Sequence, residues 1–298
     1  MSLSRPLCVL SWIALAGCAT QAYVPDLPPY QPPVADPVLM ERAAASDGFA
    51  FMHRDLSVSC LNTGSDLHPG CTLRRWTADG DEAVTSDPVF AAYRLDDHHV
   101  LLSTADLRIT LMSPEGTTEI ARGAVDLRVA DDGRRITYAQ LEGEPTVLEP
   151  GLPVTWTIHD LSSGERTALS DDPRDTAPFP LPSSSAVLFV STRSGLASLW
   201  IADEPGAEPR QLTNVGLTEV GEGFVPVPGR ELVWLEDGVT AVFSAHYGHK
   251  DLWRLDTTTG EAQRLRSGRN PQFTASGDLV AIDDEQEPPR AVVVGGVR

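Results

Sequence analysis

The stretch that decides the fold is residues 199–213, which read LWIADEPGAEPRQLT. Residues 199–202 form a short apolar segment, and a turn rich in acidic residues, Pro and Gly follows it. Residues 209–213 then begin a second segment with strand character. This order of strand, turn and strand predicts a β-hairpin. Because weaker copies of the pattern recur along the chain, the repeat is the first guide to the fold.

The copies are recognised by an anchor residue that takes the position of Trp200. The other anchors are Trp76, Leu111, Trp156 and Trp253. Each is followed by a turn containing Gly and by an aliphatic residue on the returning strand. A second, earlier hairpin lies between successive anchors, so each unit has two hairpins in roughly 45 residues, which is the period of a propeller blade. The sequence therefore predicts an all-β protein, a six-bladed β-propeller with four-stranded blades.

The sequence also indicates how the ring of blades is closed. Five units carry a clear anchor, while residues 269–298 supply inner strands without a full outer hairpin. A closed ring leaves no bare strand edge. We therefore expect an N-terminal strand at residues 37–42 to complete the last blade. Five or seven blades are the alternatives.

The N-terminus has the pattern of a targeting segment. Arg5 precedes an apolar run, residues 7–17, that is too short to span a bilayer as a helix. The run ends in LAGC at residues 15–18, which resembles the lipobox of bacterial lipoproteins. The resemblance implies that residues 1–17 are removed and that Cys18 carries the lipid. An ordinary secretory signal with an incidental Cys is the alternative.

The residue after Cys18 bears on location. In the enterobacterial sorting pattern a residue other than Asp at that position implies the outer membrane, and here it is Ala19. The resemblance thus implies an outer-membrane-anchored lipoprotein that faces the periplasm, with surface exposure as an alternative.

Residues 18–38 form a predicted tether, and residues 39–298 form the predicted propeller. The tether is dense in proline, at positions 25, 28, 29, 32, 33 and 37. Proline fixes φ and removes backbone donors, so polyproline II is expected there. A plain spacer is the simplest interpretation.

Two cysteines remain in the mature domain, Cys60 and Cys71, separated by turn residues. In an oxidising envelope compartment they are expected to form a disulfide. A metal site is the alternative, but the spacing of these cysteines and the nearby His53 and His68 matches no zinc pattern.

The charge of the chain excludes some partners. The formal net charge is -19. Binding to nucleic acid needs clustered Lys and Arg, and so does electrostatic docking on anionic lipid. We therefore expect no nucleic-acid partner and membrane contact through the lipid anchor only.

The sequence has none of the catalytic motifs that would identify a hydrolase, a zinc peptidase or a phosphate-binding loop. Neither a cofactor, a metal site nor a catalytic residue is predicted. The default binding face of a propeller is its funnel, lined by the loops before each innermost strand. The candidate residues there are Asp87, Asp126, Arg174, Asp175, Glu219, Glu222 and Arg269.

The repeat also resembles a known family. Residues 199–213, DLWRLDTTTGEAQRL at 251–265 and ADDGRRITYAQ at 130–140 are similar to the PD40 repeats of TolB-like β-propellers. The resemblance implies a non-catalytic protein-binding or scaffold module of the envelope, with envelope proteins or peptidoglycan-associated components as partners. The alternative that the family also allows is a lyase or hydrolase that acts on a polysaccharide in the funnel.

Overall fold

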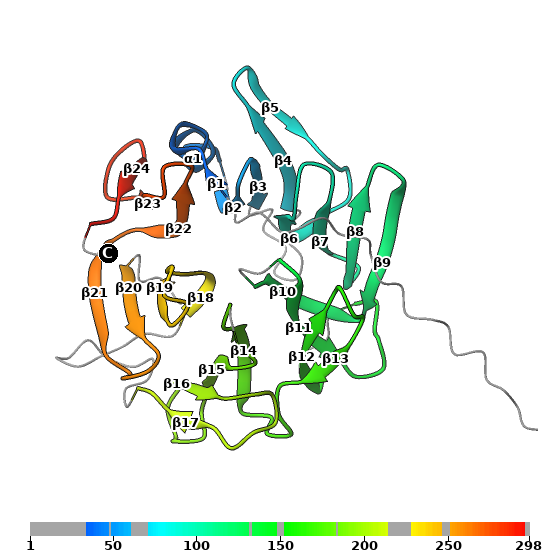
Figure 1. The fold of residues 1–298 in the computed structure, drawn as a ribbon. Coiled ribbons are helices and arrows are strands. Elements are labelled where there is room, and N and C mark those ends of the chain that lie inside the picture. The colour runs from blue at the N-terminus through cyan, green and yellow to red at the C-terminus, as the bar shows by residue number, and fades with distance from the viewer. Residues whose placement is uncertain are drawn as a thin grey trace, which may run out of the picture.

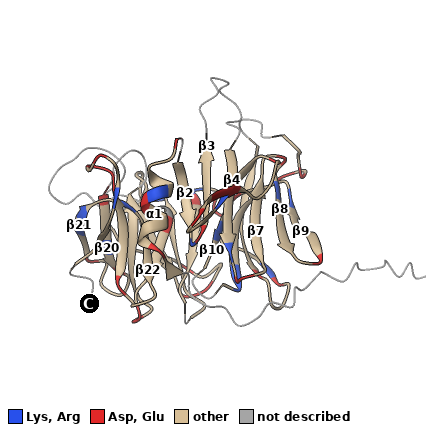
Figure 2. Ribbon diagram, turned by 90° about the horizontal axis from the view of Figure 1, so that it is seen from above, with Lys and Arg blue, Asp and Glu red and all other residues tan. Residues whose placement is uncertain are grey.

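The structure is a computed structural model of the chain and describes residues 34–47, 49–60, 71–130, 133–147, 152–182, 184–213, 228–245 and 251–295. It contains six four-stranded sheets arranged around a common centre (Figure 1). The predicted six-bladed, all-β propeller is therefore confirmed. Seen from the side, the strands run between two faces, and many acidic residues lie in the turns at these faces (Figure 2).

Five blades follow the order of the chain, and within each of them every strand pairs antiparallel with the next. Blade 1 contains β2 (Phe49–His53), β3 (Leu56–Cys60), β4 (Cys71–Thr77) and β5 (Gly80–Ala83). Blade 2 contains β6 (Val89–Arg94), β7 (Val100–Thr104), β8 (Arg108–Ser113) and β9 (Gly116–Arg122). Blade 3 contains β10 (Ala124–Val129), β11 (Arg135–Leu141), β12 (Val154–Asp160) and β13 (Arg166–Ala168). Blade 4 contains β14 (Asp175–Pro180), β15 (Val187–Ser191), β16 (Ser198–Ala202) and β17 (Arg210–Gln211). Blade 5 contains β18 (Pro228–Trp234), β19 (Thr240–Ala245), β20 (Asp251–Asp256) and β21 (Ala262–Ser267).

The repeat anchors all lie in the third strand of their blades: Trp76 in β4, Leu111 in β8, Trp156 in β12, Trp200 in β16 and Trp253 in β20. The first strand of each blade lies nearest the centre of the ring, and the fourth lies at its rim (Figure 1). Side chains from neighbouring blades form the core, and the four tryptophans contribute to these clusters. The sequence period thus corresponds to the blade.

Blade 6 closes the ring, but not in the way that the sequence predicted. Its sheet has the order β1 (Val34–Ala35), β22 (Arg269–Thr274), β23 (Leu279–Asp283) and β24 (Arg290–Val293). The N-terminal strand β1 pairs parallel with β22, at the inner edge of the blade. The expected strand at residues 37–42 is wrong, because Pro37–Ala44 is a helix, α1.

Local sequence explains this helix. The Asp36 side chain accepts hydrogen bonds from the backbone N–H groups of Val38 and Leu39, at 2.9 and 3.4 Å. Pro37 occupies the first helical position, where its fixed φ is favourable and its missing N–H costs nothing. The following residues, LMERAA, are strong helix formers. The cap and the proline were visible in the sequence and outweigh the apolar run that suggested a strand.

The innermost strands share an irregularity that affects how their side chains point. In blades 1 to 5 the pairing of the first strand with the second shifts register once, and in blade 6 the pairing of β22 with β23 does the same. In three blades a residue at the shift has positive φ: Asp126 at 53°, Ala177 at 53° and Asn270 at 57°. Such bulges redirect side chains and are common beside binding sites. They lie close to the ends at which the innermost strands begin.

The two cysteines of blade 1 are cross-strand partners in β3 and β4. Their Sγ atoms are joined in a disulfide at 2.09 Å. The bond closes the loop between the second and third strands of this blade, whose residues 61–70 lie outside the described part of the chain.

His53, at the end of β2, is a buried titratable group. It is 8% exposed, and its Nδ1 accepts a hydrogen bond from the backbone N–H of Arg94 at 3.1 Å. Burial first, and then the charges of Arg54 and Arg94, lower the pKa of His53 from 6.5 to about 3. The folded protein therefore keeps this imidazole neutral at pH values where the unfolded chain would protonate it.

We expect the free energy of unfolding to fall as the pH is lowered from 6.5 toward about 3, the interval between the unfolded and folded pKa values of His53. In this window the unfolded chain binds a proton that the folded chain does not. The contribution of one residue is at most about 1.4 kcal/mol per pH unit. His53→Gln keeps an acceptor for Arg94 and cannot titrate, so its stability should depend less on pH. Urea unfolding of both proteins between pH 7 and pH 4 measures the difference, and parallel curves would contradict it.

Candidate binding face

The candidate site lies at the face where the innermost strands begin, which we call the funnel face. The second strand of each blade ends at this face. In blade 4, for example, Asp175 at the start of β14 lies opposite Ser191 at the end of β15. The loop before the first strand and the turn after the second strand of one blade therefore meet here. At this face, the predicted site residues can therefore contact residues that are distant in sequence.

Blade 4 shows this most clearly, because Asp175 pairs with Arg193 from the turn after β15. The Nε and Nη2 atoms of Arg193 donate to the two carboxylate oxygens of Asp175 at 2.8 and 2.5 Å. The Ser170 hydroxyl donates to the same carboxylate at 2.6 Å. The Asp175 side chain is 0% exposed and that of Arg193 is 21% exposed. This is a largely buried, bidentate ion pair whose carboxylate also accepts a hydrogen bond from a hydroxyl group.

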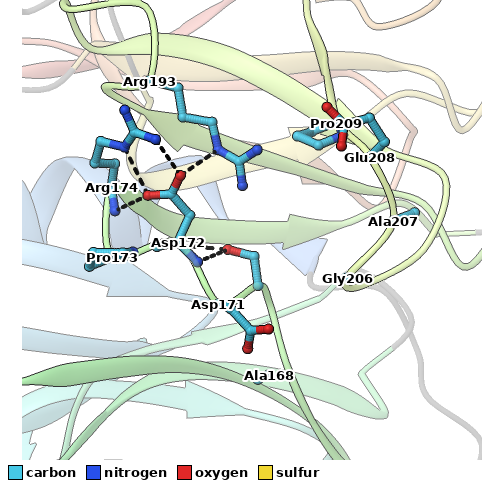
Figure 3. A pocket seen from close by; sticks show the side chains of 11 residues that line it. Ala168, Asp171, Asp172, Pro173, Arg174, Arg193, Gly206, Ala207, Glu208 and Pro209 are labelled. Carbon is cyan, nitrogen blue, oxygen red and sulfur yellow. Dashed lines mark hydrogen bonds and ion pairs between the residues drawn. The ribbon is translucent and has the colours of Figure 1, made fainter.

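Asp172 and Arg174 form a second pair, and Figure 3 shows it next to Arg193. The Nε and Nη2 atoms of Arg174 donate to the carboxylate of Asp172 at 2.9 and 2.6 Å. The Nε of Arg193 lies 3.3 Å from the same carboxylate. Hydrogen bonds from the side chain and backbone of Arg174 hold the pKa of Asp172 well below its usual range. The pKa values of Arg174 and Arg193 are raised, mainly by their hydrogen bonds to Asp172 and Asp175 respectively.

Asp172, Arg174 and Arg193 border a cavity of about 650 Å³ between blades 3 and 4. One wall comes from the end of β13 and the loop that leads to β14, and the other comes from the turn between β16 and β17. The lining residues are Ala168, Ser170, Asp171, Asp172, Pro173, Arg174, Arg193, Gly206, Ala207, Glu208 and Pro209 (Figure 3). We call this cavity the blade 3–4 groove.

Arg269, at the start of β22, makes a comparable pair in blade 6. Its Nε and Nη2 atoms donate to the carboxylate of Asp284 at 2.6 and 3.1 Å. Its guanidinium carbon lies 4.6 Å from the ring centroid of Phe49 in blade 1. Arg269 therefore links the last blade to the first.

Asp126 and Asp87 occupy other blades. Asp126 lies at the bulge of β10 and accepts a hydrogen bond from Arg128 at 3.1 Å. The guanidinium carbon of Arg128 is 4.9 Å from the ring centroid of Phe179 in blade 4. Asp87, before β6, is exposed and borders a second cavity of about 460 Å³ with Asp106 and Arg108.

Of the candidate residues, the structure brings Arg174 and Asp175 into one cluster, and it places Asp87, Asp126 and Arg269 in three other blades. Glu219 and Glu222 lie outside the described residues. Sequence reasoning did not identify Arg193 or Ser170 as partners of Asp175. The contribution of Arg193 depends on strand pairing over 18 residues, and a lone Arg in a turn carries no local signal.

Within the described ranges, no group of three or more His, Cys, Asp and Glu side chains is arranged to hold a metal ion. In the same ranges, no helix has the length and apolar character needed to cross a membrane.

Comparison with known proteins shows which folds are similar to this one. No family model and no curated protein matches the chain. TolB from Acinetobacter baumannii matches in structure with a TM-score of 0.53 and 17% identity, over 80% of this chain and 63% of that one. A chain of a nidogen/laminin complex matches with a TM-score of 0.51 and 13% identity, over 76% of this chain and 88% of that one. An oligogalacturonate lyase in complex with manganese has a TM-score of 0.49 and 11% identity, over 80% of this chain and 85% of that one.

The protein is thus a six-bladed propeller with a polar, ion-paired funnel face. More particularly, its fold is that of a TolB-like β-propeller. It spans 63% of the length of the TolB chain that it matches.

Proposed function

We propose that this protein is a lipid-anchored module of the bacterial envelope whose propeller binds other proteins and does not catalyse a reaction. The observation that carries the proposal is the state of the charged side chains at the funnel face. Asp172, Asp175 and Asp284 are each paired with an arginine. A general acid or base works best with a pKa near the operating pH. The pKa of Asp172 is lowered and those of Arg174 and Arg193 are raised, away from neutrality.

Such pairs serve recognition better than proton transfer. Their geometry is fixed by bidentate hydrogen bonds, so they present a constant pattern of charge to a partner. The resemblance to TolB supports an envelope role. The chain that matches from the nidogen/laminin complex, with a TM-score of 0.51, belongs to a protein complex.

The anchor is the second part of the proposal. Residues 15–18 provide the lipobox pattern, and acylation of Cys18 would hold the propeller at the outer membrane, facing the periplasm. Residues 18–33 precede β1 and would then connect the lipid to the ring. At about 3.1 Å per residue in polyproline II, this segment would reach roughly 50 Å.

We expect Cys18→Ser to abolish labelling with a fatty-acid probe and to release the protein from the membrane fraction. The change removes only the thiol that would carry the lipid, so the propeller should fold as before. Labelling followed by fractionation measures both effects. A wild type that takes no label, or a variant that stays in the membrane, would contradict the anchor.

Photo-crosslinking in cells tests the binding part of the proposal. A photo-crosslinking residue at Leu196, which is 49% exposed in the turn after β15, should give a discrete protein adduct in cells. The matched position is Glu115, exposed in the turn between β8 and β9 of blade 2, which lines neither of the cavities described above. Adducts at neither position, or a stoichiometric transition metal in the purified domain, would count against a binding module and favour an enzyme.

A further inference from the structure

The construction, charges and lining of the blade 3–4 groove indicate which kind of ligand it could bind. Its two walls are tied together where the backbone N–H of Gly206 donates to the carbonyl oxygen of Leu169 at 2.9 Å. This bond joins the turn of blade 4 to the loop that leaves blade 3. The groove is thus built into the junction of two blades.

The charges around the groove do not cancel. Four carboxylates, from Asp171, Asp172, Asp175 and Glu208, lie in or directly behind its walls, together with only two guanidinium groups, from Arg174 and Arg193. The two guanidinium groups are occupied by Asp172 and Asp175.

This leaves Asp171 and Glu208. Both are exposed, and neither has a hydrogen bond or an ion pair with another residue in the described part of the chain. In Figure 3 Asp171 points away from the arginines, and Glu208 lies across the groove from Arg193. The groove therefore has a residual charge of about -2 that is located on its rim.

The remaining lining is small and apolar. Ala168 and Pro173 come from the blade 3 side, and Ala207 and Pro209 come from the blade 4 turn. A Cβ atom built on Gly206 would meet nothing within 4 Å, so the groove is open above this residue. A ligand that suits such a site has an aliphatic stem to lie along the alanines and prolines and a cation to reach the carboxylates. Lysine side chains have this form.

We propose that the blade 3–4 groove binds a lysine-bearing segment of a partner protein, an inference that rests on the proposed function as a binding module. The lysine stem packs against Ala168, Ala207 and Pro209, and its ammonium group lies between the carboxylates of Asp171 and Glu208. An anionic ligand is disfavoured, because Asp172 and Asp175 already use the Nε and Nη2 atoms of Arg174 and Arg193.

The test uses two short labelled peptides, acetyl-AKAKA-amide and acetyl-AQAQA-amide, titrated with the mature domain at low ionic strength. We expect the lysine peptide to bind more tightly than the glutamine peptide. Asp171→Asn combined with Glu208→Gln should weaken the lysine peptide by about five- to tenfold, since two partly exposed ion pairs are lost.

The chain offers a matched control for this change. Asp203→Asn combined with Glu204→Gln removes the same amount of charge from the blade 4 turn that carries Glu208, at exposed residues that do not line the groove. It should change the affinity by less than about twofold. Ala168→Trp, at an exposed position of β13, fills the groove without altering any charge and should abolish the preference for lysine.

Equal losses in the two double variants would show general attraction to an acidic protein and overturn the proposal. So would an Ala168→Trp variant that binds like the wild type, or equal binding of the two peptides. The Leu196 adduct distinguishes a failure of the groove proposal from a failure of the proposed function. An adduct that persists in all groove variants, with no effect on the peptides, leaves the binding module in place and removes the groove from it. A wild type without any adduct overturns the module itself.

Discussion

A chain that begins at Phe49 is expected to lose on the order of 5 kcal/mol of unfolding free energy, whereas a chain that begins at residue 30 should keep its full stability. The shorter chain lacks β1 and α1. The longer one lacks only residues that precede β1. The difference in unfolding free energy between the two chains therefore measures how much β1 and α1 contribute to closing the ring.

The expected size follows from what α1 touches. Met40 and Ala43 are 0% exposed and pack with Trp76 of blade 1 and Ile282 of blade 6. Removing a buried methionine side chain alone typically costs about 2–5 kcal/mol. The helix therefore covers an apolar seam between the first and last blades.

Polar contacts of α1 hold the same two blades. Glu41 accepts a hydrogen bond from the backbone N–H of Ala291 in β24 at 3.1 Å. Arg42 donates to the carbonyl oxygen of Thr77 in β4 at 2.8 Å. Without the helix, the outer edge of β24 would present this N–H group to other chains.

Thermal and urea unfolding of the two truncated chains measure the effect. Within the intact chain, Met40→Ala should reproduce part of the loss, and Val38→Ser, at a position that is 63% exposed on the same helix, should be close to neutral. Equal stability of the two truncated chains would mean that β1 and α1 do not close the ring.

This closure also shows where sequence reasoning reached its limit. The blades were predictable because each must bury both faces of its sheet, so the pattern around Trp200 repeats wherever a blade does. The closing segment occurs once, and no periodicity reports it. Its local signals, Asp36 as a cap and Pro37 as the first helical residue, predict a helix but not the partner on which it packs. The parallel pairing of Val34 with Phe273 joins residues far apart in sequence.

The same limit applies to the candidate site, where local signals were predictable and long-range pairing was not. Arg174 and Asp175 were predicted because the loop before an innermost strand must reach the funnel face. Arg193 was missed because only the pairing of β14 with β15 brings it to Asp175. Positive φ at Asp126 was equally invisible, since a non-Gly residue adopts it only where surrounding structure compels it.

Asp175→Ala is expected to lower the free energy of unfolding by about 3–5 kcal/mol, because it leaves the charge of Arg193 without its main partner in a largely buried site. The side chain of Asp175 is 0% exposed and also satisfies the hydroxyl of Ser170. Arg174→Ala is the matched control. Its side chain is 54% exposed in a pair with Asp172, so its loss should cost less than about 1 kcal/mol.

The double variant Asp175→Leu with Arg193→Met tests the cause of the loss. Removing one partner of a buried pair leaves an uncompensated charge, whereas replacing both with apolar residues of similar size leaves none. We therefore expect the double variant to be more stable than Asp175→Ala, by urea unfolding at neutral pH. If the double variant is as unstable as the single one, the loss comes from packing at the start of β14 and not from charge. If Asp175→Ala costs no more than Arg174→Ala, the pair does not hold the funnel face in place, and the fixed charge pattern on which recognition depends must have another source.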